Sequence, residues 1–379
     1  MKIAILNLTS GSISGGYKKY INNVIPRLVD NLEVKSVLCA LPTGIQLKVG
    51  KNIHIIQCKP YKPFNFSPDK KLLNSINQYE PDIIFCPVER PYQHKNIPVV
   101  TMLQNMEPFV KRSILNTFKI NLKLEAQKLI GRKALKGSDG IICISNFVKY
   151  FLINDLNIPK RRTSLIYHGI GIYDANPKRM ETLPKGFNHN FIFTAGSIRP
   201  ARGLEDLINA MGILKRNGVN KKLLIAGSIS HDVLGYVQYL KKLIIEKELS
   251  DSILFVNELN QSSMKWCYIN SDIFVMTSRV ESFGIVAVEA MLNECLIISS
   301  LSPCLPEVFG DVATYYKPGD HDDLSEKIAL NLNMSNHDRL SIKLKAKKRS
   351  QLFSWDICAE RTVKFFSEII ERHNNKNRP

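Results

Sequence analysis

The sequence predicts an α/β protein with two doubly wound domains. Its 379 residues correspond to two or three domains at about 150 residues each. Short apolar runs alternate with helical patterns through both halves, which is typical of βαβ units and parallel sheets. The segment Gly169–Asn190 holds three glycines, two prolines and few apolar residues, so we expect it to connect the two halves.

In the first half, apolar runs of four to seven residues are predicted to be strands, and helical patterns separate them. The predicted strands are Lys2–Leu8, Val34–Cys39, Ile53–Gln57, Ile83–Cys86, Pro98–Met102, Gly140–Ile144 and Thr163–Tyr167. The predicted helices lie near residues 17–30, 69–79, 112–136 and 146–155.

The second half repeats this alternation and ends in a stretch without strands. Its predicted strands are Phe191–Ala195, Lys222–Ala226, Ile253–Val256, Ile273–Met276, Leu296–Ser299 and Ala313–Tyr316, with helices near residues 203–217, 232–249, 261–269, 284–293 and 320–333. Two or more helices are expected over residues 335–373, the last one opening near Trp355. We therefore assign residues 1–170 to the first domain, 171–354 to the second and 355–379 to a final helix.

The net charge of +18 is unevenly distributed. Residues 1–170 hold 25 Lys and Arg against 10 Asp and Glu, whereas residues 171–379 hold 27 against 24. Such an excess in one half indicates an anionic partner, either a nucleic acid or a membrane surface. A solvated, solubilising surface is the alternative.

The sequence carries no pattern of a membrane span or of a secreted, disulfide-linked protein. Its longest apolar runs fall far short of the roughly 18 residues that cross a bilayer. The N-terminus lacks the regions of a signal peptide. The eight cysteines occur singly, without a CxxC pair or zinc spacing. These features favour the cytoplasm.

The segment Val275–Ala290 contains the most informative loop. A strand ends near Met276, a polar loop carries Glu281, and a helix follows that contains Glu289. Backbone N–H groups at a helix N-terminus suit phosphate oxygens, and carboxylates suit the vicinal hydroxyls of a sugar. The pattern therefore indicates a nucleotide sugar. Alternatively, Glu281 is a first-turn residue that suits the helix dipole and Glu289 lies on a solvated face.

A second strand–loop–helix unit spans Phe191–Met211. After its strand it turns at Gly196 and presents Arg199 and Arg202 before a helix. Two guanidiniums at this position form a candidate diphosphate clamp, because each can bind two oxygens and stays charged. Two surface arginines in a loop are the alternative interpretation.

The first βα turn, Asn7–Gly16, is rich in Gly and Ser but lacks the GxGxxG spacing of dinucleotide-binding proteins. It is predicted to be either a mobile turn or a loop whose backbone approaches a ligand.

Together these segments resemble family 4 retaining glycosyltransferases of GT-B fold, of the kind that build bacterial lipopolysaccharide and capsule. The resemblance rests on Glu281-x7-Glu289 with the turn Pro303–Glu307, on Gly196–Met211, on Ile144–Ile170 and on Asn270–Ser278. It covers the chain from end to end. It implies two Rossmann-like domains that face a central cleft, a first domain that binds the acceptor, a second that binds the nucleotide sugar, and a final helix that crosses back.

The resemblance also implies roles for individual residues. Glu281 would hold hydroxyls of the donor sugar, and Glu289 the ribose. Arg202 lies where the family has the lysine of its phosphate clamp, while Ser197 replaces a common arginine, so Arg199 is expected to compensate. The remaining donor-binding residues implied are Gly16, Gly196, Ser282, Phe283, Gly284 and Ile285.

The chain departs from the family where many members carry a histidine near the reacting carbon. It has Gln104 and Asn105 there, on the acceptor side, and neither side chain is a general base at pH 7. This suits retention with proton transfer to the leaving phosphate; Glu107 or another carboxylate would be needed for inversion. No metal-binding aspartate pair is evident, so we expect neither a divalent metal nor another cofactor.

The segment Lys111–Lys136 carries eight basic residues and one acid. Its apolar residues include Ile114, Phe118, Leu122 and Leu129, so it either docks on anionic lipid or packs on its own domain.

The sequence thus predicts a retaining transferase that moves a hexose-type sugar from a nucleoside diphosphate to a glycan or lipid-diphosphate-linked glycan. It is expected in the cytoplasm, in part at the inner face of the membrane. A nucleotide-sugar epimerase or hydrolase of the same fold is the alternative. A nucleic-acid binder is less favoured, because no stacking-aromatic or helix-turn-helix motif accompanies the charge.

Overall fold

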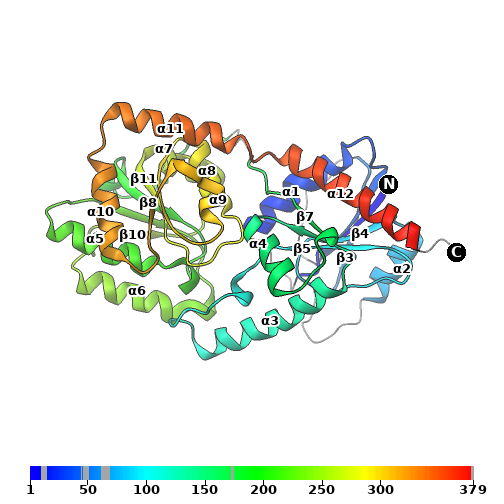
Figure 1. Cartoon of the computed structure of the whole chain (residues 1–379). Coiled ribbons are helices and arrows are strands. Elements are labelled where there is room, and N and C mark those ends of the chain that lie inside the picture. The colour runs from blue at the N-terminus through cyan, green and yellow to red at the C-terminus, as the bar shows by residue number, and fades with distance from the viewer. Residues whose placement is uncertain (10–14, 44, 46–50, 61–68, 172–174, 377–379) are drawn as a thin grey trace. The chain divides into compact units, whose positions relative to one another are not determined.

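The computed structural model describes residues 1–9, 15–43, 45, 51–60, 69–171 and 175–376. The chain divides into two compact units (Figure 1). The first contains residues 1–109, 123–171 and 353–379, and the second contains residues 110–122 and 172–352. The boundaries at 171/172 and 352/353 lie within two residues of those expected from the sequence.

The first unit contains a seven-stranded parallel sheet in the order β3-β2-β1-β4-β5-β6-β7. Its strands are β1 (Lys2–Leu6), β2 (Ser36–Pro42), β3 (Ile53–Cys58), β4 (Ile83–Cys86), β5 (Val99–Leu103), β6 (Gly140–Cys143) and β7 (Thr163–Leu165). Each predicted strand of this half is confirmed, with shifts of up to three residues at its ends.

Helices cover both faces of this sheet. They are α1 (Gly15–Val29), α2 (Lys70–Tyr79), α3 (Phe118–Gly137), which begins in the second unit, α4 (Asn146–Tyr150) with a π-helical turn (Phe151–Asp155), and α12 (Trp355–Lys376). On one face, Leu72 and Ile76 of α2 pack against alternate strand residues such as Leu6 and Ile84. On the other face, Phe85 contacts Tyr20 of α1 and Phe366 of α12.

The last helix, α12, returns to the first unit and lies beside α1 (Figure 1). Gly169 makes this approach possible, since a Cβ there would lie 2.1 Å from the backbone nitrogen of Trp355. Trp355 and Tyr20 enclose His168, which is 3% exposed. The predicted return of the final helix is confirmed.

The second unit contains a six-stranded parallel sheet in the order β10-β9-β8-β11-β12-β13. Its strands are β8 (Phe191–Ala195), β9 (Leu223–Ala226), β10 (Ile253–Val256), β11 (Ser271–Met276), β12 (Leu296–Ser300) and β13 (Ala313–Tyr316). Its helices are α5 (Leu204–Arg216), α6 (Leu234–Glu246), α7 (Gln261–Asn270), α8 (Ile285–Leu292), α9 (Leu305–Phe309), α10 (His321–Leu332) and α11 (Asn336–Ser350).

Side chains alternate between the two faces along each strand of the second sheet, so its apolar residues pack into two cores, one on each face. Ile192 and Ile273 pack with α5, α6 and α10 on one face. Phe193 and Phe274 contact Tyr268 of α7 on the other. The four central strands β8, β9, β11 and β12 are therefore buried on both sides, which explains their continuous apolar runs in the sequence.

The prediction for residues 112–117 was wrong, because helix α3 begins only at Phe118. Side-chain oxygens of Ser113 and Thr117 accept hydrogen bonds from the backbone of Leu115 and Ile120, at 3.2 and 3.3 Å. Such local bonds compete with helical ones. The segment 110–122 also clusters with the second unit rather than with the first domain expected from the sequence.

Among the described residues, no helix has the length and apolarity to cross a membrane. All eight cysteines are free and buried.

Candidate active site

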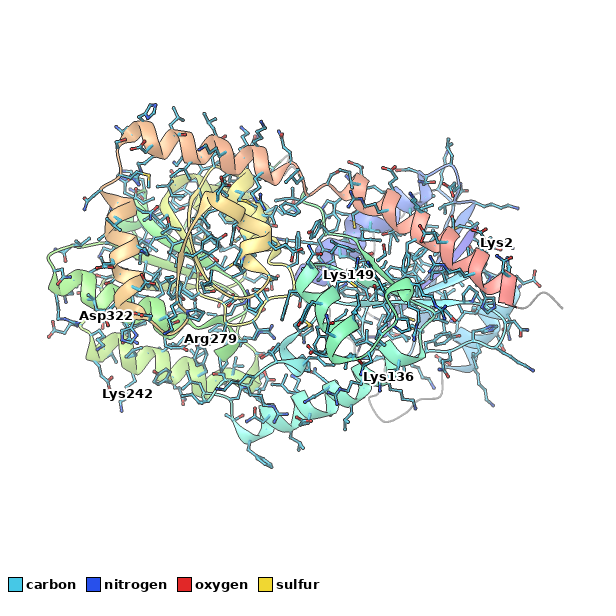
Figure 2. All side chains as sticks on the ribbon, viewed as in Figure 1. Lys2, Lys136, Lys149, Lys242, Arg279 and Asp322 are labelled. Atoms are coloured by element: carbon cyan, nitrogen blue, oxygen red, sulfur yellow. The ribbon has the colours of Figure 1, made fainter. Side chains whose placement is uncertain are left out.

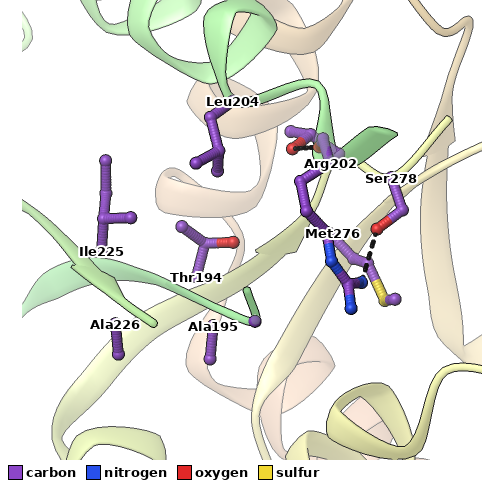
Figure 3. Close-up of a pocket in the computed structure, with 10 residues that line it drawn as sticks. Thr194, Ala195, Arg202, Leu204, Ile225, Ala226, Met276 and Ser278 are labelled. Atoms are coloured by element: carbon purple, nitrogen blue, oxygen red, sulfur yellow. Dashed lines mark hydrogen bonds between the residues drawn. The ribbon is translucent and has the colours of Figure 1, made fainter. Parts of the chain in front are cut away.

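The candidate donor site lies where β8 and β11 end, side by side in the second sheet. From β8 the chain continues through α5 to β9 on one side, whereas from β11 it continues through α8 to β12 on the other. Ligands of open α/β sheets bind at such a switch point, beyond the carboxyl ends of the strands. A pocket lies here (Figure 3); its lining includes Gly196, Arg202, Thr277 and Ser278.

Arg202 and Glu281 form an ion pair at this pocket. Ser278 joins them, since its hydroxyl lies 2.9 Å from Nη1 of Arg202 and 3.0 Å from Oε1 of Glu281. The two charged side chains are 19% and 13% exposed. The sequence-based roles gave the cation to a phosphate and the carboxylate to a sugar. The structure pairs the two with each other.

Glycines allow the two loops to approach each other. Gly203 has φ +62°, and a Cβ there would lie 2.6 Å from the carbonyl oxygen of Thr277. The hydroxyl of Thr277 donates to the carbonyl of Arg202 at 2.6 Å, and the backbone N–H of Arg279 donates to the carbonyl of Ala201 at 2.9 Å. The arginine loop and the glutamate loop are thus joined through their backbones.

Gly196 has a different role, because it lies against the side chain of Arg202. Its φ is +140°, and a Cβ there would lie 3.0 Å from Cζ of Arg202. The backbone of the predicted turn at Gly196 therefore also packs against the guanidinium of Arg202.

The predicted donor-binding residues 282–285 lie at the start of α8. Gly284 caps the helix with φ +88°. Ser282 and Phe283 are 7% and 2% exposed, so the side chain of Phe283 belongs to the core. Only the backbone of Phe283 is left to contact a ligand, whereas Ile285 is half-buried; the ligand contacts implied by the family resemblance stay predictions.

Glu289 lies inside α8 and is only 1% exposed. Its Oε2 accepts a hydrogen bond of 3.1 Å from the hydroxyl of Tyr268, which is also 3.2 Å from the carbonyl oxygen of Val286. The alternative of a solvated helix face is therefore wrong. Sequence reasoning missed Tyr268, because no motif marks a tyrosine on the preceding helix.

Arg199 does not accompany Arg202 into the pocket. It precedes the short 3-10 helix Pro200–Arg202 in extended conformation and is half-buried. Among the described residues that line the pocket, Arg202 is the arginine.

Sequence reasoning also missed Arg279, which joins the glutamate loop to α5. Figure 2 labels Arg279. Its Nη2 lies 2.8 Å from the carboxylate of Glu205 and 2.7 Å from that of Asp206, and these two residues are 7% and 2% exposed. Burial raises the pKa of Asp206, and the charge of Arg279 opposes that rise. Burial by itself lowers the pKa of Arg279, but the hydrogen bond to Glu205 and both acidic charges raise it above its usual value.

Gln104 and Asn105, which are expected on the acceptor side, follow β5 in the first unit. The backbone N–H groups of both residues donate to Oε1 of Glu89, that of Asn105 at 2.7 Å. The side-chain Nε2 of Gln104 donates to the carbonyl of Pro87 at 2.8 Å. Gly16 lies in the exposed first turn of α1, while residues 10–14 of the predicted glycine-rich loop lie outside the described residues.

Two family models match the chain, one for each half. The model of glycosyltransferase family 4 matches residues 14–172, and that of glycosyl transferases group 1 matches residues 177–349. The chain belongs to this glycosyltransferase family. The family resemblance is thereby confirmed, and the two parallel-sheet α/β units agree with the expected fold class.

Relatives of this family member include an uncharacterized glycosyltransferase of Methanocaldococcus jannaschii, 30% identical over 63% of the chain and 62% of the relative. The O-antigen chain mannosyltransferase RfbU of Salmonella typhimurium is 23% identical over 50% of each chain. The chain thus covers less than two thirds of the length of these relatives.

Solved structures share the fold of this glycosyltransferase family member over nearly the whole chain. Sucrose-phosphate synthase from Thermosynechococcus elongatus has a TM-score of 0.76 and 17% identity, covering 98% of this chain and 100% of its own. HepE from Anabaena in complex with UDP-glucose has a TM-score of 0.69 and 19% identity, covering 99% and 100%.

The described part of the chain contains no group of three or more His, Cys, Asp or Glu placed to hold a metal ion. The expectation of metal-independent chemistry stays a prediction.

Proposed function

We propose that this protein is a retaining glycosyltransferase that moves a hexose-type sugar from a nucleoside diphosphate to a hydroxyl of a glycan or lipid-linked glycan. The observation that carries the proposal is the group of Arg202, Ser278 and Glu281 at the switch point of the second sheet. The O-antigen relative and the UDP-glucose complex of HepE support the substrate class.

The paired side chains suit both ends of such a donor. A diphosphate offers Arg202 the oxygens that Glu281 now supplies, and the sugar hydroxyls offer Glu281 the hydrogen-bond donors that it then needs. Arg202 would stabilise the negative charge that develops on the departing diphosphate. Glu289 would accept hydrogen bonds from the ribose, with Tyr268 orienting its carboxylate. Gly196 is proposed to contribute its backbone to the donor site, while the donor-binding roles of Gly16 and Arg199 rest on the family resemblance alone, since neither lines this pocket.

Retention follows if the departing phosphate takes the proton of the attacking hydroxyl on the same face of the sugar. Gln104 and Asn105 carry no basic side chain, which fits a reaction without a protein base at that position. We propose that neither a metal nor another cofactor takes part.

The acceptor would be reached at a membrane surface through α3. Phe118, Leu122 and Leu129 are 83%, 62% and 65% exposed. Their spacing places them within about 40° of each other around the helix axis, so they form one stripe. Exposed basic residues accompany it, namely Lys119, Lys123, Arg132, Lys133 and Lys136 (Figure 2 labels Lys136).

An exposed apolar stripe with basic flanks fits an anionic lipid surface. The sequence analysis gave an alternative, in which the apolar residues of this segment pack on their own domain. That alternative is wrong for these three residues. We propose a cytoplasmic enzyme that binds the inner face of the membrane peripherally.

The decisive experiment compares wild type with Glu281→Gln in transfer assays against UDP-, GDP-, dTDP- and ADP-sugars without added metal. We expect the variant to lose transfer by about 10²-fold or more, because charge-assisted bonds to the donor are lost. Glu246→Gln, an exposed residue of α6, is the matched control and keeps full activity.

Nuclear magnetic resonance of the product would report its anomeric configuration, and inversion would contradict the proposed mechanism. Full activity of Glu281→Gln would contradict the role of the site. Release or isomerisation of the sugar without any acceptor would instead identify a nucleotide-sugar hydrolase or epimerase.

A further inference from the structure

The first sheet has a switch point of its own, between β1 and β4. From β1 the chain continues to β2 and β3 on one side, while β4 to β7 lie on the other. Asn7 directly follows β1, Glu89 lies shortly after β4, and Gln104 and Asn105 follow the next strand. Because the carboxyl ends of parallel strands meet at one edge, these polar residues gather at the position where such sheets bind ligands.

Glu89 is the centre of this group. Two consecutive backbone N–H groups, those of Gln104 and Asn105, converge on its Oε1. Glu89, which lies 15 positions before Gln104 in the chain, thereby fixes the turn after β5. The backbone N–H of Glu89 itself also hydrogen-bonds to its carboxylate, and because a carboxylate offers about four acceptor positions, it keeps the capacity to accept a further bond.

The surroundings of Glu89 are polar, and the residue itself is half-buried. Burial raises the pKa of Glu89, and the bonds from Asn105 and Gln104 and the charge of Arg90 oppose the rise. Tyr17 of α1 lies near it, since the charge of Glu89 contributes, after burial and two cysteines, to raising the pKa of Tyr17. Tyr17 in turn donates to Oδ1 of Asn7, whose Nδ2 donates to the carbonyl of Ala40 at 2.9 Å.

We propose that Oε2 of Glu89 binds a hydroxyl group of the acceptor, while Oε1 holds the turn that carries Gln104 and Asn105. This inference rests on the proposed function and deepens it. A carboxylate at this position accepts hydrogen bonds from a sugar or polyol hydroxyl and repels an anionic group. The acceptor is therefore a sugar or polyol whose hydroxyls, rather than a phosphate, face the first sheet.

The test is Glu89→Gln in a transfer assay with a hydroxyl acceptor. The amide oxygen can still accept both backbone bonds, whereas the amide nitrogen in place of Oε2 can only donate. We expect KM for the acceptor to rise by about tenfold to a hundredfold, as for the loss of a bond to a charged group. KM for the nucleotide sugar and the melting temperature stay unchanged. Glu80→Gln, an exposed residue at the end of α2, is the control.

A pH profile separates a binding role from a purely structural one. The wild type should lose affinity for the acceptor as the pH falls through the raised pKa of Glu89, because the protonated carboxyl no longer accepts as strongly. In Glu89→Gln this limb of the profile disappears. Arg90 and Tyr17, which face the carboxylate, are unchanged in both proteins.

Three other outcomes would overturn the inference. If wild type transfers sugar and Glu89→Gln has the same acceptor KM and pH profile, Glu89 is not an acceptor ligand, and the proposed function stands. If donor and acceptor KM rise together, the residue only supports the fold. If wild type transfers no sugar from any of the four nucleotide sugars, the proposed function fails, and this inference fails with it.

Discussion

At the scale of single residues, the candidate site is organised by arginines that bridge distant parts of the chain. Arg202 contacts Ser278 and Glu281 in the loop after β11. Arg279, in that same loop, contacts two buried acids of α5. Ion pairs therefore join the arginine loop to the glutamate loop, and the glutamate loop to α5. We expect the position of Glu281 to depend on Arg279 as well as on Arg202.

Replacing Arg279 by Met should destabilise the second unit, because it leaves the carboxylates of Glu205 and Asp206 buried without their cation. Removing one partner of a buried pair costs about 3 kcal/mol or more. For a unit of this size, that corresponds to a fall in melting temperature of roughly 6 to 12 °C. Thermal unfolding followed by circular dichroism measures this fall.

Arg216→Met, at an exposed position on α5, is the comparison and should leave the melting temperature within about 2 °C of wild type. Equal melting temperatures for Arg279→Met and Arg216→Met would show that Arg279 contributes no more than a surface residue.

At the scale of secondary-structure elements, the exposed stripe on α3 is the least expected feature. The inner side of α3 packs against the protein as in an ordinary amphipathic helix, since Ile120, Leu124 and Ile130 are buried. Its outer side carries Phe118 and Leu122 into solvent. A helix that is apolar on two sides has a second partner besides its own core.

The triple variant Phe118→Ser/Leu122→Ser/Leu129→Ser should abolish flotation with vesicles that contain anionic lipid. Wild type should bind anionic vesicles and not purely zwitterionic ones, because the basic flanks supply part of the attraction. Binding should weaken as salt is raised.

A matched control removes exposed leucines elsewhere, at Leu330 of α10 and Leu344 of α11, which are 62% and 53% exposed. Loss of flotation in this control as well would mean that general hydrophobicity, rather than α3, mediates binding. Flotation of the α3 variant at the wild-type level would contradict the proposal.

At the scale of the whole molecule, the last helix completes the first unit. Trp355 of α12 packs with Tyr20 of α1 and with His168, which lies just before the connection to the second unit. Burial lowers the pKa of His168 to about 3. The folded protein therefore keeps this imidazole neutral at pH values where an unfolded chain would protonate it.

This difference makes stability depend on pH. The unfolded chain binds the proton at about pH 6.5 and the folded chain only near 3, so stability is complete above about 6.5 and declines as the pH falls between these values. The slope from this one group approaches about 1.4 kcal/mol per pH unit. Urea midpoints measured from pH 7 to pH 5 should fall less steeply in His168→Gln than in wild type.

His337→Gln, at a histidine whose side chain is 92% exposed, is the control and should retain the wild-type slope. Parallel slopes in wild type and His168→Gln would contradict a neutral, buried His168.

Most of the fold could be predicted because its signals are local. Apolar runs such as Phe191–Ala195 define strands on their own, and the glycines and prolines after Gly169 mark the connection. The two loops that carry Arg202 and Glu281 could be found for the same reason, since each directly follows a strand. Their roles as donor ligands stay predictions, as do those of Glu289 and Arg199.

The sequence by itself determined the fold class, the order of elements and the two loops, because strand and helix periodicity acts over a few residues. Only the tertiary structure decided which charges meet. Arg202 pairs with a residue 79 positions away, and Glu89 with a turn 15 positions away. These contacts depend on the order of strands in each sheet, and the exposure of α3 depends on what packs around it, which no local pattern encodes.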